Sequence, residues 1–583
     1  MKANPQLITQ FINFNEKLSI PFFQRAYVWQ EEQWERLIAD MKFVSRTQAP
    51  YFMGSVILKE EKGGNGQIVG QTIIDGQQRI TTLAIFYKVF CLIDGSGMWF
   101  DNTFRTADDN SLVIEHNYNT KKDFERILNL ETLEDIPVDE KSSNVIRAYD
   151  YFKREIPAIL AEDSSALNLK VLPKLLTFVV INLDSNEDEQ QIFDTINSLG
   201  VKLTTGELLK NYFYNKSSIA EYEASWKPVF ENDKVCLSYW GKEYSSGRTK
   251  RNNLEVFFYS FLMIKLQDPE LKVSAEDKNY FGRYESLFNN YKTFINKYNI
   301  DRKKLISEIL DYANIYRENL DFIKVDKDKG DETPAEYGIE RINTIIYGME
   351  VNTIIPYVLY VLKNVADINE RTAIFKVLES YIMRRYICQS LNKNYNKLFA
   401  ENLIVNNVLT ADALINHFKT FRGAQLSSMA MPDDGELEVA FETNKLYNKQ
   451  ATCILYLLES ALRDPKMGTE LRPLGGYTLE HMMPKKWRNK WSYPTNISED
   501  ERDKNLLTLG NLAIITQPLN SSIRDSDWLT KLNGKGTKTG LKVNAAGLIT
   551  IQSALSQTEW DENTIKKRAA ELANLSQKVW PKL

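Results

Sequence analysis

The chain contains few of the residues that build disulfides or thiolate metal sites. Only four of its 583 residues are cysteines and none belongs to a Cys-x-x-Cys pair, so neither a disulfide framework nor a zinc–thiolate site is predicted. The longest apolar stretch, Ile354 to Leu362, is far shorter than the roughly 20 residues of a membrane helix. The pattern Gly-x-x-x-x-Gly-Lys-Ser/Thr is also absent, which excludes a P-loop. We therefore expect a cytoplasmic protein that does not contact a membrane.

Length and composition predict a globular protein of several domains. Hydrophobic residues make up 43% and charged residues 26% of the chain, as in ordinary folded proteins. A single core stops growing at roughly 250 to 300 residues, so we expect two to four domains. The net charge of -4 offers no overall attraction for nucleic acid, but residues 481–538 contain ten Lys or Arg against six Asp or Glu. This surplus suits phosphate contact and is also common on solvated surfaces. The pair Arg384-Arg385 could contact DNA phosphate or an acid of another domain; a solvated helix face is the commoner explanation, and the choice stays open.

The pattern of apolar residues predicts strands and helices in an N-terminal domain over 1–215. Apolar residues recur at helical spacing between about Glu31 and Phe43, which predicts a helix there. Two β-like stretches flank a Gly-rich segment and predict a hairpin. The elements expected after that helix are strands over 51–59 and 67–74, a helix over 78–93, a strand over 177–183 and a helix over 187–199.

Beyond residue 215 the pattern is helical almost throughout. We predict a helical middle domain over 216–422 and a linker over 423–436, where Gly, Ser, Pro and Asp gather. A C-terminal domain would span 437–583 and open with a helix over about 443–463. The fold class that follows is α+β and predominantly helical.

The chain has three histidines, so each can be weighed by its surroundings. His116 lies in a polar stretch and His417 on an apolar helix, and for both we expect structural or surface roles. His481 ends a strand-like run and is followed by a basic, irregular loop. An apolar strand over 509–516 and a helix around 528–532 come next, so the predicted order is strand, loop, strand, helix.

The residues around His481 form a motif. Glu480-His481-x-x-Pro484, then Gly510-Asn511-Leu512 and Asn520, resemble the HNH pattern of GmrSD-type restriction enzymes and of the RNA-guided CRISPR nucleases. The resemblance implies a ββα-metal nuclease fold in which His481 is the general base that activates water. It also implies that Glu480 and Asn520 hold one Mg²⁺ or Mn²⁺, and that Asn511 fixes the loop bearing His481. A neutral imidazole and oxygen ligands suit phosphodiester cleavage. Because the last position of the motif is Asn and not His, a degenerate nuclease stays open.

A second motif joins a predicted strand to the helix that follows it. Its residues are Asp75, Gly76, Gln77, Gln78 and Arg79. Free backbone N–H groups and the helix dipole attract phosphate at such a junction, Gly76 allows close approach, and Arg79 can add a forked charge. Taken alone, the segment favours a capped turn with a surface arginine.

Other segments link this junction to the same family. Together with Gln24-Arg25, it resembles the N-terminal domain of the GmrSD-type proteins, which is similar to the ParB/sulfiredoxin nucleotide-binding fold. By this resemblance Gln24, Arg25 and the Asp-Gly-Gln-Gln-Arg segment bind an NTP. A third segment containing Asn197 and Gly200 also matches, but Leu199 stands where the family has Arg or Lys.

Both motif sets implicate modification-dependent restriction enzymes. We therefore expect an NTP-regulated, divalent-metal-dependent DNA endonuclease of anti-phage defence that cuts modified phage DNA. The residues leave open whether GTP, UTP, CTP or ATP binds, which modification is sensed, and whether the chain forms a homodimer. Two alternatives remain: a nucleotide-switched DNA-binding protein with an inactive HNH fold, and an RNA-cleaving toxin.

Overall fold

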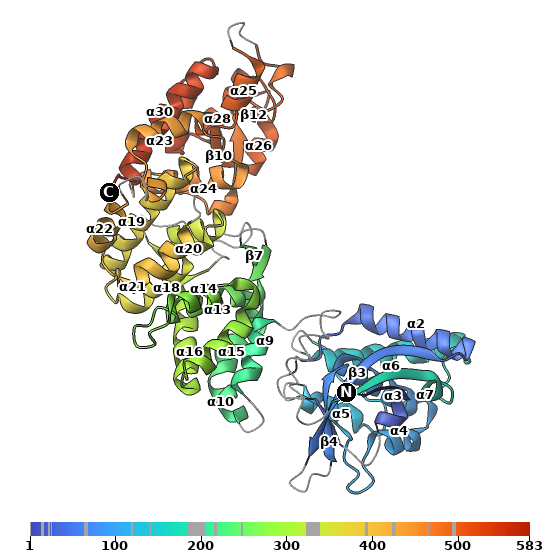
Figure 1. The fold of residues 1–583 in the computed structure, drawn as a ribbon. Helices are drawn as coiled ribbons and strands as arrows, with labels where there is room; N and C mark the ends of the chain where they lie inside the picture. Colours follow the sequence, from blue (N-terminus) through green and yellow to red (C-terminus); the bar gives the residue numbers. More distant parts are fainter. Residues whose placement is uncertain are drawn as a thin grey trace. The chain divides into compact units, whose positions relative to one another are not determined.

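The chain divides into two units, Met1–Glu223 and Ala224–Leu583 (Figure 1). Helices and strands are both present and helices predominate, as predicted. The predicted middle and C-terminal domains both fall in the second unit, and their separation stays a prediction. The computed structural model describes residues 2–12, 17–20, 24, 26–62, 68–117, 120–139, 142–183, 204–214, 218–246, 249–321, 338–390, 394–421, 427–464, 466–492 and 497–583.

A mixed six-stranded sheet forms the centre of the first unit. Its strands are β1 (Lys2–Leu7), β2 (Lys17–Ser19), β3 (Tyr51–Lys62), β4 (Ile68–Asp75), β5 (Ile114–Glu115) and β6 (Leu176–Leu183). The strand order is β1-β6-β3-β4-β2-β5. Strand β3 pairs with β4 in antiparallel and with β6 in parallel orientation. The predicted strands over 51–59, 67–74 and 177–183 are thus confirmed, and the three lie side by side in one sheet.

One helix of the first unit is buried on all sides. Helix α3 has no exposed residue between Ile80 and Cys91, because an evenly apolar helix must bury its whole circumference. It packs against its neighbours α4 and α6. The predicted helix at Glu31 is confirmed and ends where Gln48 adopts the left-handed conformation. The helices are α1 (Ile8–Phe11), α2 (Glu31–Thr47), α3 (Gln77–Asp94), α4 (Gly97–Phe104), α5 (Lys121–Leu128), α6 (Asn144–Glu162), α7 (Leu172–Leu175), α9 (Thr205–Phe213) and α10 (Ile219–Ala224), the last reaching the unit boundary.

The first half of the second unit is helical, as predicted, apart from one hairpin. Strands β7 (Glu243–Ser246) and β8 (Thr249–Asn252) pair in antiparallel orientation. Apolar and polar residues do not alternate in this segment, so the sequence did not predict these strands. The helices of this half are α11 (Trp226–Phe230), α12 (Lys234–Gly241), α13 (Asn253–Lys265), α14 (Ala275–Phe281), α15 (Leu287–Lys297), α16 (Arg302–Asn319), α17 (Ile339–Asn343), α18 (Ile355–Asn364), α19 (Ile368–Ile387), α20 (Tyr395–Lys397), α21 (Leu403–Val405) and α22 (Ala411–Lys419).

Two buried arginines attach α19 to the chain that leads into the C-terminal region. Arg384 donates to the carbonyl oxygens of Trp580 and Pro432, at 2.6 and 3.1 Å. Arg385 donates to the carbonyl oxygens of Ala430 and Ser428, at 2.8 and 2.9 Å. Both side chains are almost completely buried, so neither lies on a solvated helix face, and Arg384 also contacts the acid Asp434.

The C-terminal region contains the predicted strand–loop–strand order followed by a helix. Strand β9 (Tyr477–His481) pairs in antiparallel orientation with β10 (Leu512–Thr516), and the short turn η11 (Leu509–Asn511) precedes β10. The predicted helix over 443–463 begins later, at Asn448. The helices are α23 (Asp434–Thr443), α24 (Asn448–Leu462), α25 (Glu499–Asn505), α26 (Gln517–Ile523), α27 (Trp528–Asn533), α28 (Leu541–Asn544), α29 (Gln552–Leu555) and α30 (Glu562–Val579).

Two details of this region differ from expectation. Helix α23 begins at Asp434, inside the segment predicted as a linker, because Asp433 caps it and Glu436 completes a capping box. Asn520 lies on the short helix α26, in a segment for which no helix was predicted. Across the described parts of both units, every helix is too short or too polar to cross a membrane.

Candidate functional site

His481 is the last residue of β9. It pairs with Leu512 across the ladder, and the strand ends there because the next backbone N–H, that of Met482, turns to the carbonyl oxygen of Asn511 at 3.0 Å. Pro484 follows within the same turn and cannot donate to a sheet ladder. The strand end thus places the imidazole beside an irregular loop.

The imidazole of His481 has an unpaired ring nitrogen. The side chain is partly buried, and its Nε2 atom is itself buried without a hydrogen-bond partner among the described residues. Burial, helped by the positive charges of Lys485 and Lys531, lowers the pKa of His481 to about 4. The ring is therefore neutral at pH 7, which is the state a general base requires.

Glu480 is paired with a lysine that sequence reasoning missed. Lys531 on α27 is fully buried, and its Nζ atom donates to Glu480 Oε1 and, at 2.8 Å, to the carbonyl oxygen of His481. Burial raises the pKa of the Glu480 carboxyl and lowers the pKa of the Lys531 ammonium, and each charge counters the shift of its partner. Asp525 also acts on both groups through its charge. Lys531 therefore bridges the two residues of the Glu-His pair.

Asn511 fastens the turn after His481 with both ends of its amide. Its oxygen accepts from the Met483 backbone N–H at 2.8 Å and from Trp560 Nε1 at 3.0 Å. Its nitrogen donates to the carbonyl oxygens of Met483 and Leu506, at 2.9 and 3.1 Å. The side chain is completely buried, so these four bonds hold the loop beside His481 in one conformation.

Asn520 lies beside β9, on the first helix after β10. Its amide nitrogen donates to the carbonyl oxygen of Leu479 at 3.1 Å. The amide oxygen accepts no hydrogen bond from the part of the chain that the structure describes. The described geometry thus places Glu480, His481, Asn511 and Asn520 around one strand end.

The oxygen atoms of Glu480 and Asn520 suit a cation that takes few ligands from the protein. No group of three or more His, Cys, Asp or Glu that could hold a metal occurs in the described ranges. The free oxygen donors are one oxygen of Glu480, whose partner oxygen accepts from Lys531, and the amide oxygen of Asn520. Mg²⁺ commonly takes one or two protein oxygens and completes its shell with water and substrate phosphate. The number and kind of these oxygens suit such a cation, and the Lys531 ammonium on Glu480 opposes one.

The Asp-Gly-Gln-Gln-Arg motif forms the predicted strand-to-helix junction. Asp75 ends β4, Gly76 caps α3 with a φ of 101°, and such a conformation favours glycine. Arg79 is part-buried and donates to the carbonyl oxygens of Met53 and Ser55, at 3.0 and 2.7 Å, and Asp75 lies 3.5 Å from the same guanidinium. Arg79 thus joins the start of α3 to β3 through hydrogen bonds, and it is not the freely exposed arginine of a simple capped turn.

Two glutamines complete this junction. Gln24 donates to the carbonyl oxygens of Ile73 and Ile74, at 3.2 and 2.7 Å, which brings it to the end of β4. Gln78 accepts from the Val28 backbone N–H at 2.9 Å and donates to Ala26. Gln77 is buried. Three further residues predicted to bind nucleotide, Arg25, Asn197 and Gly200, lie outside the described residues.

The other two histidines have structural surroundings, as predicted. The ring nitrogens of His116 lie 2.9 Å from Thr81 Oγ1 and 2.8 Å from Thr120 Oγ1, and burial lowers its pKa to about 4. His417 packs edge-on against Phe421. Neither residue has an acidic group bonded to it in the described chain.

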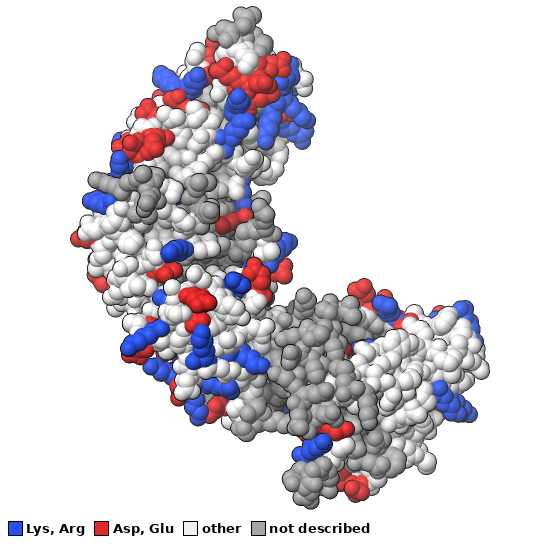
Figure 2. Space-filling model, viewed as in Figure 1, with Lys and Arg blue, Asp and Glu red and all other residues white. Residues whose placement is uncertain are grey.

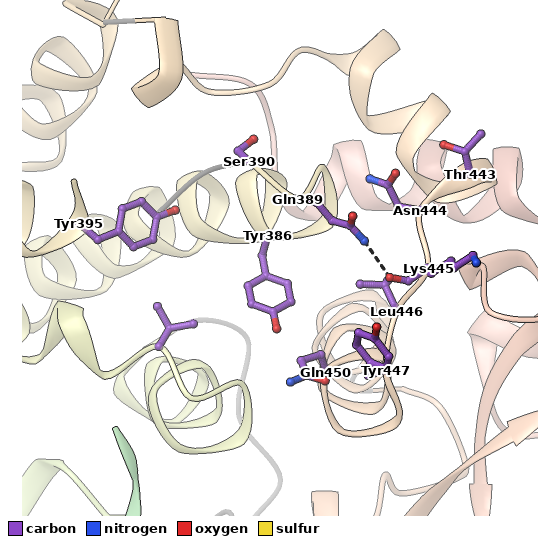
Figure 3. Close-up of a pocket in the computed structure, with 11 residues that line it drawn as sticks. Tyr386, Gln389, Ser390, Tyr395, Thr443, Asn444, Lys445, Leu446, Tyr447 and Gln450 are labelled. Carbon is purple, nitrogen blue, oxygen red and sulfur yellow. Dashed lines mark hydrogen bonds between the residues drawn. The ribbon is translucent and has the colours of Figure 1, made fainter. Parts of the chain in front are cut away.

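A cavity of about 610 Å³ lies between the end of α19 and the start of α24 (Figure 3). Tyr386 and Gln450 point into it, and Gln389 donates to the carbonyl oxygen of Lys445 at its edge. The cavity shares no lining residue with either motif. It is therefore separate from the site around His481.

Comparison with known families agrees with both motifs. The sequence-family model for the N-terminal domain of GmrSD restriction endonucleases matches residues 8–214. The family model for the C-terminal domain of these enzymes matches residues 431–575. Together the two matches cover more than half of the chain. A comparison with curated proteins finds no match. The chain belongs to the GmrSD restriction endonuclease family, and is accordingly a nuclease of the phage-defence restriction type.

Proposed function

We propose that the region around His481 is an HNH nuclease site of the ββα-metal type that hydrolyses phosphodiester bonds of DNA. The observation that carries the proposal is the neutral imidazole at the strand end, whose buried Nε2 atom has no partner among the described residues. In this mechanism, Nε2 takes a proton from water as the water oxygen bonds to phosphorus. The bond from phosphorus to the leaving oxygen breaks, and that oxygen takes a proton from solvent.

Three neighbouring residues support this step. Asn511 holds the turn after His481, so the imidazole keeps its orientation. Glu480 and Asn520 would hold one Mg²⁺ or Mn²⁺ through oxygen. Such a cation, when bound, neutralises the charge that develops on the phosphate and the leaving oxygen.

The proposal assigns nucleotide binding to the first unit. Backbone N–H groups at the start of α3, next to Gly76, suit a phosphate, and Gln24, Gln78 and Arg79 fix the junction by bonds to backbone groups. A ParB-like domain that binds and hydrolyses NTP would then control the nuclease. The substrate in this account is modified phage DNA.

A second candidate is a nucleotide-switched DNA-binding protein whose HNH fold is inactive. One observation favours it: Lys531 already neutralises Glu480, the only carboxylate of the motif. A buried ammonium at this position competes with a divalent cation for the same carboxylate.

Digestion of DNA by the full chain separates these candidates. The protein is incubated with unmodified and base-modified phage DNA, with Mg²⁺, Mn²⁺ or EDTA, and with or without each of the four NTPs. Our proposal predicts cutting that needs the cation, responds to an NTP and prefers modified DNA. Binding without cutting in every condition would favour the inactive fold, and cutting of RNA but not DNA would favour a toxin nuclease.

A further inference from the structure

A glycine-rich hairpin follows the helix that carries Lys531. Residues 534–540 read Gly-Lys-Gly-Thr-Lys-Thr-Gly, and strands β11 (Gly534–Lys535) and β12 (Lys538–Thr539) pair in antiparallel orientation. Gly536 forms the turn with a φ of 65°. Neither motif includes this segment, and no step proposed for His481 uses it.

The base of the hairpin is packed against the turn that carries Lys531. A Cβ atom on Gly540 would lie 2.5 Å from the carbonyl oxygen of Lys531 and 2.6 Å from that of Leu532, so only glycine permits this approach. Gly534 has a φ of 94°, and a Cβ there would meet the carbonyl oxygen of Lys538. Because Lys531 contacts both Glu480 and His481, the hairpin has a fixed position relative to the site.

The hairpin presents two lysines of like charge to solvent. Lys535 and Lys538 are exposed and face each other directly across the ladder. Like charges at such positions destabilise a hairpin, and neither lysine forms an ion pair with a described acidic residue. Figure 2 shows Lys and Arg side chains gathered over the region that Figure 1 labels β12 and α26. A bound polyanion would relieve this repulsion.

The chemistry of the hairpin suits a phosphate backbone and not bases. Its exposed groups are ammonium ions, the hydroxyls of Thr537 and Thr539, and glycine backbone, all of which contact phosphate in DNA complexes. It has no aromatic residue, so it lacks the stacking platform that single strands use. Lys535 lies four residues after Lys531, so their Cα atoms are at most about 14 Å apart. This distance equals the length of about four nucleotides along one DNA strand.

We propose that this hairpin grips the backbone of duplex DNA a few nucleotides from the bond that His481 cuts. This inference rests on the proposed function, because it takes the cleaved DNA as the partner. Each lysine would release about one counterion from DNA, so the two together contribute about 2 to the slope of log affinity against log salt concentration.

Salt-dependent binding of the full chain tests the proposal. Fluorescence anisotropy with a labelled duplex of about 30 base pairs, in EDTA, gives the affinity between about 50 and 300 mM KCl. The double variant Lys535→Gln, Lys538→Gln should reduce the slope by about 2 and weaken binding at 0.1 M salt on the order of 50-fold. The matched control, Lys566→Gln with Lys567→Gln on α30, removes two exposed lysines from an element on the other side of this unit (Figure 1) and should leave the slope unchanged.

The possible outcomes are distinct. If the hairpin variant keeps the wild-type slope, or the control loses as much, the hairpin does not grip DNA, while the nuclease proposal stands. If the wild-type chain binds no DNA at all, the proposed function itself fails. Tighter binding to an RNA duplex of the same sequence would overturn DNA as the partner. Thermal melting of both variants checks that each is folded, since all four lysines are exposed.

Discussion

Replacing Lys531 by Met should destabilise the second unit through Glu480. Lys531 and Glu480 are 0% and 4% exposed, and the ammonium is the only cation bonded to that carboxylate among the described residues. Met keeps much of the side-chain volume but leaves the carboxylate buried without its counter-charge. Removing one partner of a buried ion pair typically costs about 3 to 5 kcal/mol.

The loss can be expressed as a melting temperature. The entropy of unfolding is about 2.1 cal/mol/K per residue, or about 0.75 kcal/mol/K for the roughly 360 residues of the second unit. The expected decrease is therefore about 4 to 7 °C, measured by calorimetry on the full chain. The double variant Lys531→Met, Glu480→Gln removes both charges and should recover part of the decrease.

The double variant also provides the control. A coupling energy of about 1 to 3 kcal/mol between the two substitutions would identify the pair as the cause. If Lys531→Met lowers the melting temperature by less than about 1 °C, or if the two effects simply add, the buried pair does not hold this region together.

Three further predictions concern other parts of the chain. Thorough chelation by EDTA should stop cleavage and Mn²⁺ should restore it; cutting that survives chelation would remove Glu480 and Asn520 as metal ligands. Arg79→Ala should lower the stability of the first unit by about 1 to 3 kcal/mol, because two carbonyl oxygens of β3 lose their donor; loss of NTP binding without a change in melting would instead indicate direct phosphate contact. Burial lowers the pKa of His116 to about 4, so the unfolded chain binds more protons than the folded chain between pH 6.5 and about 4. The contribution of His116 to the stability of the first unit should be complete above that window and fall by about 3 kcal/mol as pH decreases through it, and the melting of this unit in His116→Gln should lack that contribution.

Sequence reasoning predicted the elements that depend on local patterns. The helix at Glu31, the strands β3, β4 and β6, and the placement of His481 at a strand end all follow from apolar periodicity and from Pro484. It failed where burial depends on distant partners. Arg384 and Lys531 look like surface charges, because the carbonyls and the carboxylate that accept their hydrogen bonds lie about 50 residues or more away.

Short elements were missed for a different reason. The hairpin β7–β8 and the helix α23 lack an apolar repeat long enough to register as periodic. No helix was predicted around Asn520, yet α26 forms there and has Pro518 in its first turn, where proline is favoured. That proline was the available signal for a helix over this segment.

The central claim, that His481 is the general base of a DNA nuclease, is tested most directly by comparing the cleavage rates of wild type and His481→Ala. Both proteins are incubated with the same modified phage DNA in Mg²⁺, and their melting temperatures are measured alongside. Loss of a general base should lower the rate by about 10² to 10⁴ while the melting temperature stays the same, because Nε2 bonds to no described residue. Cutting by His481→Ala at the wild-type rate would contradict the claim.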